Sequence, residues 1–217
     1  MALCCTFHTI DEPYLYYLNY LYQRLFSHNP TIILCSLSVL ATCLYLFDES
    51  AHDLLAYQRE VLWSQPWRLI TANICHTNGY HLVFNLAGLI LLQQLFHFTS
   101  RKLILLLLIS SLCVTVGLYI FEPTVNWYVG LSGSLHALFA YGALQDIHKK
   151  VKFGQLLLCG LIVKLIYEHA FESIWIAQLI EANVMTSSHV IGAMAGVAYF
   201  VLEAAFRLKS NKSNLTK

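Results

Sequence analysis

Long apolar runs alternate with short polar stretches along most of this chain. Six apolar segments can be marked out, at residues 31–47, 80–98, 103–121, 131–147, 151–170 and 188–206. A helix needs about 20 apolar residues to cross the roughly 30 Å hydrocarbon core of a bilayer, and several of these segments are near the lower limit. The pattern therefore predicts an all-α membrane protein whose six transmembrane helices pack as a bundle.

The composition also indicates a membrane protein. Of the 217 residues, 58% are hydrophobic and 12% are charged, and the mean hydropathy is +0.59. A soluble domain carries roughly a quarter charged residues, so lipid must solvate much of this apolar surface. The net charge is +1 and the sequence has no basic stripe, so nothing indicates nucleic acid as a partner.

Basic residues gather on one side of the predicted membrane topology. Ten of the 13 lysines and arginines fall before the first span, in the loops after the second and fourth spans, or after the sixth: Arg24, Arg101, Lys102, Lys149, Lys150, Lys152, Arg207, Lys209, Lys212 and Lys217. The positive-inside rule then predicts that both chain termini are cytoplasmic, in agreement with an even number of spans.

The two ends of the chain differ from the apolar middle. The first thirty residues lack the order of a signal peptide, and PYLYYLNYLYQRLF resembles an amphipathic helix lying at the membrane interface. We therefore expect an interfacial segment over 1–30, a six-helix domain over 31–207 and a cytoplasmic tail over 208–217.

The seven cysteines show neither CxxC spacing nor a paired ligand pattern, and four of them lie in apolar runs. Cysteine in such runs behaves as a small hydrophobe, so we expect no disulfide framework and no metal site. Cys75 and His76 look like a thiol–base pair, but sequence neighbours in an extended segment point apart, which disfavours a catalytic Cys75. Nothing in the sequence implies a cofactor.

Polar residues occur where a lipid-facing helix would not carry them. Asn85, Ser132 and His136 lie in the second and fourth spans and should face the interior of the bundle. Ser132, His189 and His81 begin the fourth, sixth and second spans, each after a loop on the extracytoplasmic side. Three helices far apart in the sequence thus present reactive groups at one membrane depth.

These residue types suit acyl transfer. A serine hydroxyl becomes a good nucleophile when a base takes its proton, and histidine suits that task near neutral pH. His81 and Asn85 share one helix face and, with the backbone N–H of Ser132, could stabilise an oxyanion. No acidic residue lies close to His189 in the sequence, so we expect a Ser132–His189 dyad rather than a triad.

Glycines adjoin both members of this pair. Gly130 and Gly133 allow a tight turn into the fourth span, and Gly192 and Gly196 form a small-residue stripe after His189. Such stripes let membrane helices approach closely, so we expect the sixth helix to pack tightly on the fourth.

Lys164 lies inside the fifth span, with Glu168 one turn later. An intramembrane lysine is costly unless it is paired, so the favoured interpretation is an i,i+4 ion pair near the outer end of the span. A Ser–Lys dyad is the functional alternative.

Taken together, the motifs resemble the rhomboid family of intramembrane serine proteases. WRLITANICHTNGYHLVFN is similar to the family's outer-loop Trp-Arg motif followed by spaced histidines, and GLSG to its nucleophile motif. SHVIGAMAG is similar to its sixth-helix motif, so the resemblance runs over residues 67–200. It implies a six-helix bundle with proteolytic activity.

The resemblance also implies roles for individual residues. Ser132 would be the nucleophile and His189 the general base, while His81 and Asn85 would stabilise the oxyanion. The remaining matches are His76 in a supporting role and Trp67 and Arg68 in a structural motif of the outer loop.

His136 departs from the family pattern, in which a tyrosine often stands four residues after the serine. A histidine there can stack on the catalytic imidazole, which is the favoured interpretation, or compete with it as a base. GLSGSLHALFAYGAL and the segment from Lys164 to Glu168 are more similar to the rhombosortase branch. That branch implies a bacterial inner-membrane enzyme whose active site faces the periplasm, acting on exported proteins with glycine-rich C-terminal membrane tails.

Two other functions compete with this hypothesis. A catalytically inactive rhomboid-like protein would bind transmembrane helices, but such proteins typically lack the serine or the histidine, and both are present. A small transporter with histidine proton relays would show internal repeats or broken helices, and the sequence contains neither.

Overall fold

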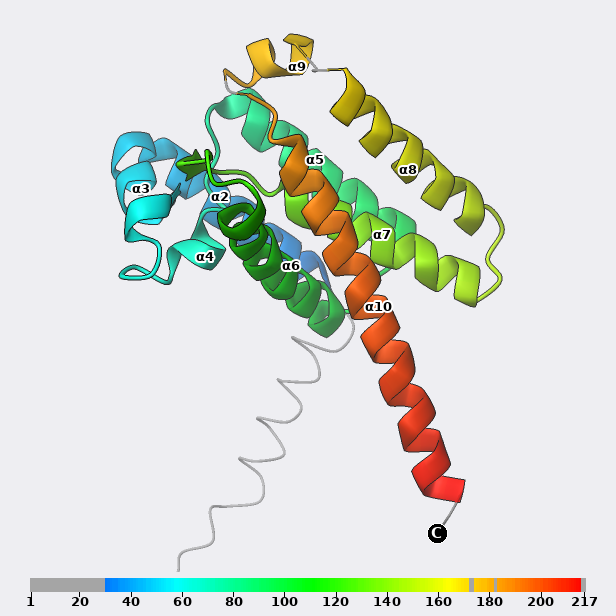
Figure 1. Cartoon of the computed structure of the whole chain (residues 1–217). Helices are drawn as coiled ribbons and strands as arrows, with labels where there is room; N and C mark the ends of the chain where they lie inside the picture. Colours follow the sequence, from blue (N-terminus) through cyan, green and yellow to red (C-terminus); the bar gives the residue numbers. More distant parts are fainter. Residues whose placement is uncertain (1–29, 172–173, 182, 216–217) are drawn as a thin grey trace, which may run out of the picture.

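The computed structural model describes residues 30–171, 174–181 and 183–215. Six long helices dominate this part of the chain (Figure 1): α2 (Pro30–Leu46), α5 (Gly79–Phe96), α6 (Ser100–Phe121), α7 (Ser132–His148), α8 (Gly154–Ala170) and α10 (Thr186–Leu215). Each overlaps one of the six apolar segments of the sequence. The interfacial helix expected over residues 1–30 falls almost wholly outside the described residues.

Three of the described helices are long and apolar enough to cross a membrane, namely α5, α6 and the Thr186–Lys209 part of α10. α2 is apolar but shorter, and α7 and α8 have 17 residues each. The helical bundle is therefore a property of the structure, whereas six membrane crossings stay a prediction. α10 continues to Leu215, so most of the segment expected to be a tail extends the last helix.

Local capping fixes where α5 begins. The Asn78 side chain accepts a hydrogen bond from the His81 backbone N–H at 3.0 Å, which satisfies one of the free N–H groups of the first turn. α5 ends at Phe96, the following residue His97 has a left-handed φ of 50°, and α6 starts three residues after His97. The cap sets the position of His81, one of the residues singled out from the sequence.

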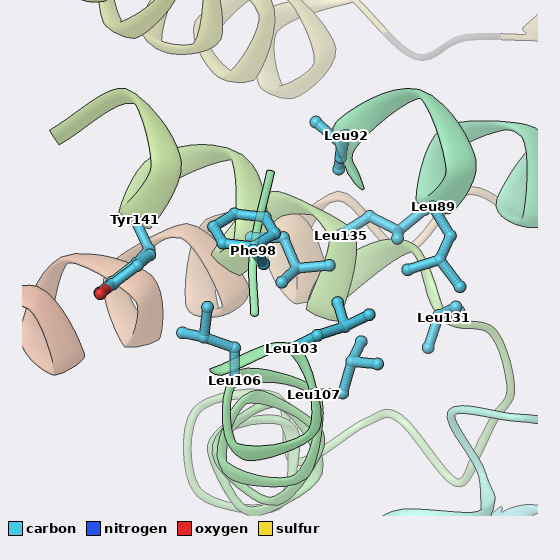
Figure 2. Close-up of a cluster of buried hydrophobic side chains, with 10 residues drawn as sticks. Leu89, Leu92, Phe98, Leu103, Leu106, Leu107, Leu131, Leu135 and Tyr141 are labelled. Carbon is cyan, nitrogen blue, oxygen red and sulfur yellow. The ribbon is translucent and has the colours of Figure 1, made fainter. Parts of the chain in front are cut away.

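A cluster of buried leucines and two aromatic residues joins α5, α6 and α7 (Figure 2). Leu89 from α5, Leu103 from α6 and Leu138 from α7 are fully buried in it. Burying one such side chain stabilises a fold by roughly 1.5–3 kcal/mol when water is the alternative. The cluster fixes the three helices against one another along the first half of α7.

α7 and α10 cross in backbone contact (Figure 1). A Cβ atom at Gly192 would overlap the carbonyl oxygen of Gly133, and one at Gly196 would overlap the carbonyl oxygen of Ala137. A Cβ at Gly133 would lie 2.9 Å from the Ser188 carbonyl oxygen. The close approach expected from the glycine stripe is therefore present, and it requires glycine on both helices.

The long outer loop forms a compact unit beside the bundle. It contains α3 (Asp48–Leu55), β1 (Tyr57–Gln58), the short 3-10 helix η1 (Arg59–Val61) and α4 (Arg68–Thr71). β1 pairs antiparallel with β2 (Trp127–Tyr128), which precedes α7. The Gly130 N–H also donates to the Ala72 carbonyl at 3.1 Å, so this loop holds the approach to Ser132.

Arg68 organises this loop from within. It is only 2% exposed, and it donates to three oxygens of the loop: Asp53 O at 2.5 Å, Ala56 O at 2.6 Å and Gln65 Oε1 at 2.7 Å. Trp67 is half exposed and donates its indole N–H to the Leu54 carbonyl at 2.9 Å. The structural role that the resemblance implied for this pair agrees with these contacts.

α8 lies at the edge of the bundle beside α7 (Figure 1). Leu161 is buried against Ala140 and Ala193, while Val163 and Ile166 are more than half exposed. The short helix α9 (Ile174–Leu179) follows it and leads toward α10. Few apolar side chains hold α8, so its polar contacts matter for its position.

Candidate active site

Ser132 lies at the first position of α7, directly after a glycine turn. Gly130 has a φ of +126°, a conformation that glycine adopts without strain. A Cβ at Gly130 would lie 2.8 Å from the His81 ring, so the glycine also makes room for that ring. The turn brings the N-terminus of α7 next to the start of α5.

Tyr128 holds the strand before this turn. Its buried hydroxyl donates to the Gly130 carbonyl at 2.8 Å. Burial raises the pKa of Tyr128 to about 12, so the hydroxyl keeps its proton and stays a donor at neutral pH.

His189 lies in the first turn of α10 and is 6% exposed. Its Nε2 atom is 2.9 Å from the Ser132 hydroxyl oxygen, a hydrogen-bond distance. The two residues are 57 positions apart, and the glycine contact between α7 and α10 brings them together.

Glu168 contacts the other side of the same imidazole. Its Oε2 atom is 3.0 Å from His189 Nδ1, and its side chain is 11% exposed. This acidic partner was not expected from the sequence, because Glu168 is 21 positions away from His189 and no acidic residue lies close to it along the chain. The expected depth in the membrane could have indicated that Glu168 lies near His189, since Glu168 was already expected near the outer end of its span.

The ion pair between Lys164 and Glu168 is present, with Lys164 Nζ 2.6 Å from Glu168 Oε1. The ammonium group also lies 2.8 Å from His136 Nε2. Within the described part of the chain, the Lys164 ammonium bonds to Glu168 and His136 and not to Ser132, so this geometry does not favour the alternative Ser–Lys dyad.

His136 stacks on His189, with ring centroids 4.1 Å apart and planes 16° from parallel. Its Nδ1 atom is 2.7 Å from the Ser132 carbonyl oxygen, one helical turn earlier. The ring is therefore held at both nitrogens, in the stacked arrangement that was one of the two expectations for it.

His81 and Asn85 line the same cavity as Ser132, and both are buried. His81 Nδ1 is 3.0 Å from the Thr77 hydroxyl oxygen, and Asn85 Nδ2 donates to the His81 carbonyl at 3.1 Å. The pair thus belongs to the same site as Ser132 and His189.

His76 stands behind His81, outside the helices. The two rings meet edge to face at 5.1 Å, and burial lowers the pKa of His76 to about 3, so its ring is neutral at physiological pH. Burial also raises the pKa of the adjacent Cys75 thiol to about 11, and that side chain packs with Ala56 and Val129. Cys75 is therefore a packing residue.

A cavity of about 580 Å³ opens over Ser132. Its lining combines polar groups from α5, α7, α8 and α10 with apolar side chains such as Phe84, Trp127, Leu135 and Met185. An apolar pocket with a few convergent polar groups is the usual form of a binding site.

One group of side chains has the residue types of a metal site. One donor atom each from His136, Glu168 and His189 lie within 4.8 Å of one another. However, the two rings are stacked, so their nitrogen lone pairs lie in two nearly parallel planes, and the Lys164 ammonium occupies His136 Nε2. The arrangement suits proton transfer better than coordination of a cation.

Residues 64–206 match the rhomboid domain family, a stretch that includes every residue of this site. No curated protein matches the chain.

Proposed function

The chain belongs to the rhomboid family, and from that premise we propose that it is a serine endopeptidase that cleaves membrane-anchored proteins, with Ser132 as nucleophile and His189 as general base. Family members are generally intramembrane serine proteases. The observation that carries the proposal is the 2.9 Å distance from His189 Nε2 to the Ser132 hydroxyl at the floor of an apolar cavity.

The reaction begins when Ser132 Oγ attacks the carbonyl carbon of the scissile peptide bond. His189 Nε2 takes the hydroxyl proton as the new C–O bond forms, which gives a tetrahedral oxyanion and an imidazolium. The C–N bond then breaks, and His189 gives the proton to the leaving amine. Water attacks the resulting acyl-serine in the same way, so that the carboxylate product leaves and both side chains return to their starting state.

The oxyanion needs hydrogen-bond donors that are fixed before the reaction. The Asn85 amide, the His81 ring and the backbone N–H of Ser132 surround the cavity around the serine. The Gly130 turn supports this role, because any side chain there would push the His81 ring away.

The favoured substrates are exported proteins that carry a glycine-rich C-terminal membrane tail, as in the rhombosortase branch. The Lys164–Glu168 pair and His136 in place of an aromatic residue support this subtype through the resemblance. A helical amide is shielded by its own hydrogen bonds, and each glycine weakens a helix by about 1 kcal/mol, so a glycine-rich segment unwinds easily for cleavage.

We further propose six membrane crossings with both termini in the cytoplasm. Ten of the 13 basic residues lie on that side, and the catalytic pair lies at the opposite end of its helices. In a bacterial inner membrane the active site would then face the periplasm.

The first test is labelling of the detergent-solubilised protein with a fluorophosphonate, which reacts with activated serines. We expect labelling of the wild type and none of Ser132→Ala or His189→Ala. A wild type that is folded but not labelled would favour the catalytically inactive, helix-binding alternative.

The second test addresses the substrate. The protein is co-expressed with a reporter carrying a glycine-rich C-terminal membrane tail, alongside a matched reporter in which leucines replace the glycines. Removal of the glycine-rich tail alone supports the subtype, and tail removal that persists in Ser132→Ala and His189→Ala would sink the proposed pair. Cleavage of an ordinary single-span substrate with the tail left intact would indicate a general rhomboid protease.

A further inference from the structure

α8 carries two charged side chains among apolar ones, and both point at the catalytic helices. Glu168 is 11% exposed and Lys164 is 48% exposed, and between them they contact both stacked imidazoles, His136 and His189. A charge inside a membrane helix is costly unless it is paired. An ion pair between these two side chains would already meet that cost, so it does not explain why each of them has a second partner in the site.

The two oxygens of Glu168 have separate partners. Oε1 accepts from the Lys164 ammonium at 2.6 Å, and Oε2 is 3.0 Å from His189 Nδ1. A carboxylate can only accept, so the His189 proton must be on Nδ1. Its Nε2 then presents a lone pair to the Ser132 hydroxyl, which is the tautomer that a general base needs.

Lys164 fixes the neighbouring ring in the same way. An ammonium group has three donors and no acceptor, so His136 Nε2 must be the accepting nitrogen of the 2.8 Å contact. The remaining proton is on Nδ1, which donates to the Ser132 carbonyl at 2.7 Å. His136 is thereby held neutral with its basic nitrogen occupied, and it cannot take the serine proton.

We propose that Glu168 and Lys164 are positioning residues of the reaction. Glu168 completes a Ser132–His189–Glu168 triad, and Lys164 keeps His136 a neutral ring for His189 to stack on. This inference rests on the proposed protease function. When His189 takes the proton of Ser132, Glu168 stabilises the imidazolium from one side and the face of His136 covers it at 4.1 Å.

Four charged or titratable side chains of the described residues face His189. These groups are His136 on α7, Glu168 and Lys164 on α8, and His81 on α5. Among these groups of the described residues, Glu168 is the one that carries a negative charge, so its removal is expected to have a characteristic pH signature.

The test compares fluorophosphonate labelling rates of the full chain between pH 5 and 9. We expect Glu168→Gln to lower the labelling rate by up to about 10⁴-fold, the size of the loss when the orienting acid of a serine protease triad is replaced by its amide. We expect the acidic limb of the rate–pH profile to move to lower pH by about one unit, because protonation of His189 loses its counter-charge. Glu168→Asp keeps the charge and should retain the wild-type profile at a reduced rate.

His169→Gln is the matched control, since it changes a titratable and exposed neighbour of Glu168 on the same helix. It should leave both rate and profile unchanged. If Glu168→Gln stays folded, by thermal unfolding in detergent, and labels within about threefold of wild type with the same pH profile, the triad is overturned. Labelling that depends on Ser132 and His189 would then leave the proposed function standing.

A double-mutant cycle tests Lys164. We expect Lys164→Met to lower the labelling rate about tenfold in the wild-type background, because His136 Nε2 becomes free to compete for a proton. In a His136→Phe background the ring has no basic nitrogen, so the same change should cost less than about threefold. If Lys164→Met lowers the labelling rate by the same factor in both backgrounds, the proposal that Lys164 acts through His136 is overturned.

Discussion

Gly192→Ala is expected to separate the proposed catalytic pair, Ser132 and His189, without touching either residue. The added Cβ would lie 2.6 Å from the Gly133 carbonyl carbon and would overlap its oxygen. Carbon atoms in contact lie about 3.5 Å apart or more, so α10 must retreat from α7 by at least about 0.9 Å, and relief of the overlap with the oxygen requires more.

That movement acts on the reaction distance directly, because His189 precedes Gly192 by three positions on the same rigid helix. A retreat of about 0.9 Å lengthens the 2.9 Å contact between His189 Nε2 and Ser132 Oγ beyond hydrogen-bond range, which ends near 3.2 Å. Misplacement of a catalytic group by 1 Å can cost about 10²-fold, and we expect a loss of that size in kcat/KM.

The assay is cleavage of a tailed reporter in proteoliposomes, with thermal unfolding measured in parallel. Gly160→Ala is the control, because a Cβ at Gly160 on α8 meets no atom within 4 Å. It should leave the cleavage rate unchanged and raise stability slightly through helix propensity. A folded Gly192→Ala enzyme within about threefold of wild-type activity would refute the inference that the glycine contact sets the catalytic distance.

Three further outcomes are expected. Asn85→Ala should lower kcat by about 10²-fold with little change in KM, if its amide stabilises the oxyanion, and single-turnover cleavage separates the two parameters. Arg68→Met leaves three buried or half-buried loop oxygens without their donor and should cost about 3 kcal/mol of unfolding free energy, measured by thermal unfolding. Burial lowers the pKa of His76 to about 3, so the unfolded chain binds this proton more tightly than the folded chain does. The free energy of unfolding should therefore be unaffected by His76 above about pH 6.5. Below that pH it should fall by up to about 1.4 kcal/mol per pH unit. His76→Phe should remove that part of the slope, and an unchanged slope between pH 6.5 and 4 would contradict a buried, neutral His76.

The sequence was most informative where one physical rule applies to a long stretch. Hydropathy located all six long helices, because a lipid-facing helix has to be apolar along its length. The glycines at positions 133 and 192 indicated a close helix crossing, and the structure has it. The end of α10 was missed, since Leu215 lies in a polar stretch whose helix continues without an apolar pattern to mark it.

Contacts that depend on how a helix is rotated about its own axis could not be predicted from hydropathy or motifs. Glu168 was expected near one end of its helix, but a position along the helix does not say which side of α8 faces His189. The same limit applied to Lys164, for which an ion pair and a catalytic contact were both open. The compact outer loop was also missed, since α3, α4 and the two short strands are held by tertiary hydrogen bonds such as those of Arg68.

The α7–α10 contact and the α8 side chains control different properties of one imidazole, so their variants should fail differently. α10 meets α7 backbone to backbone and sets how far His189 is from Ser132. Glu168 sets which nitrogen carries the proton and how stable the imidazolium is. Gly192→Ala keeps every charged group, so it should slow the reaction at all pH values and leave the pH profile in place, whereas Glu168→Gln should slow it and shift the profile. If both variants slow labelling and neither shifts the profile, Glu168 acts only by holding α8 in position, and the carboxylate has no part in the protonation of His189.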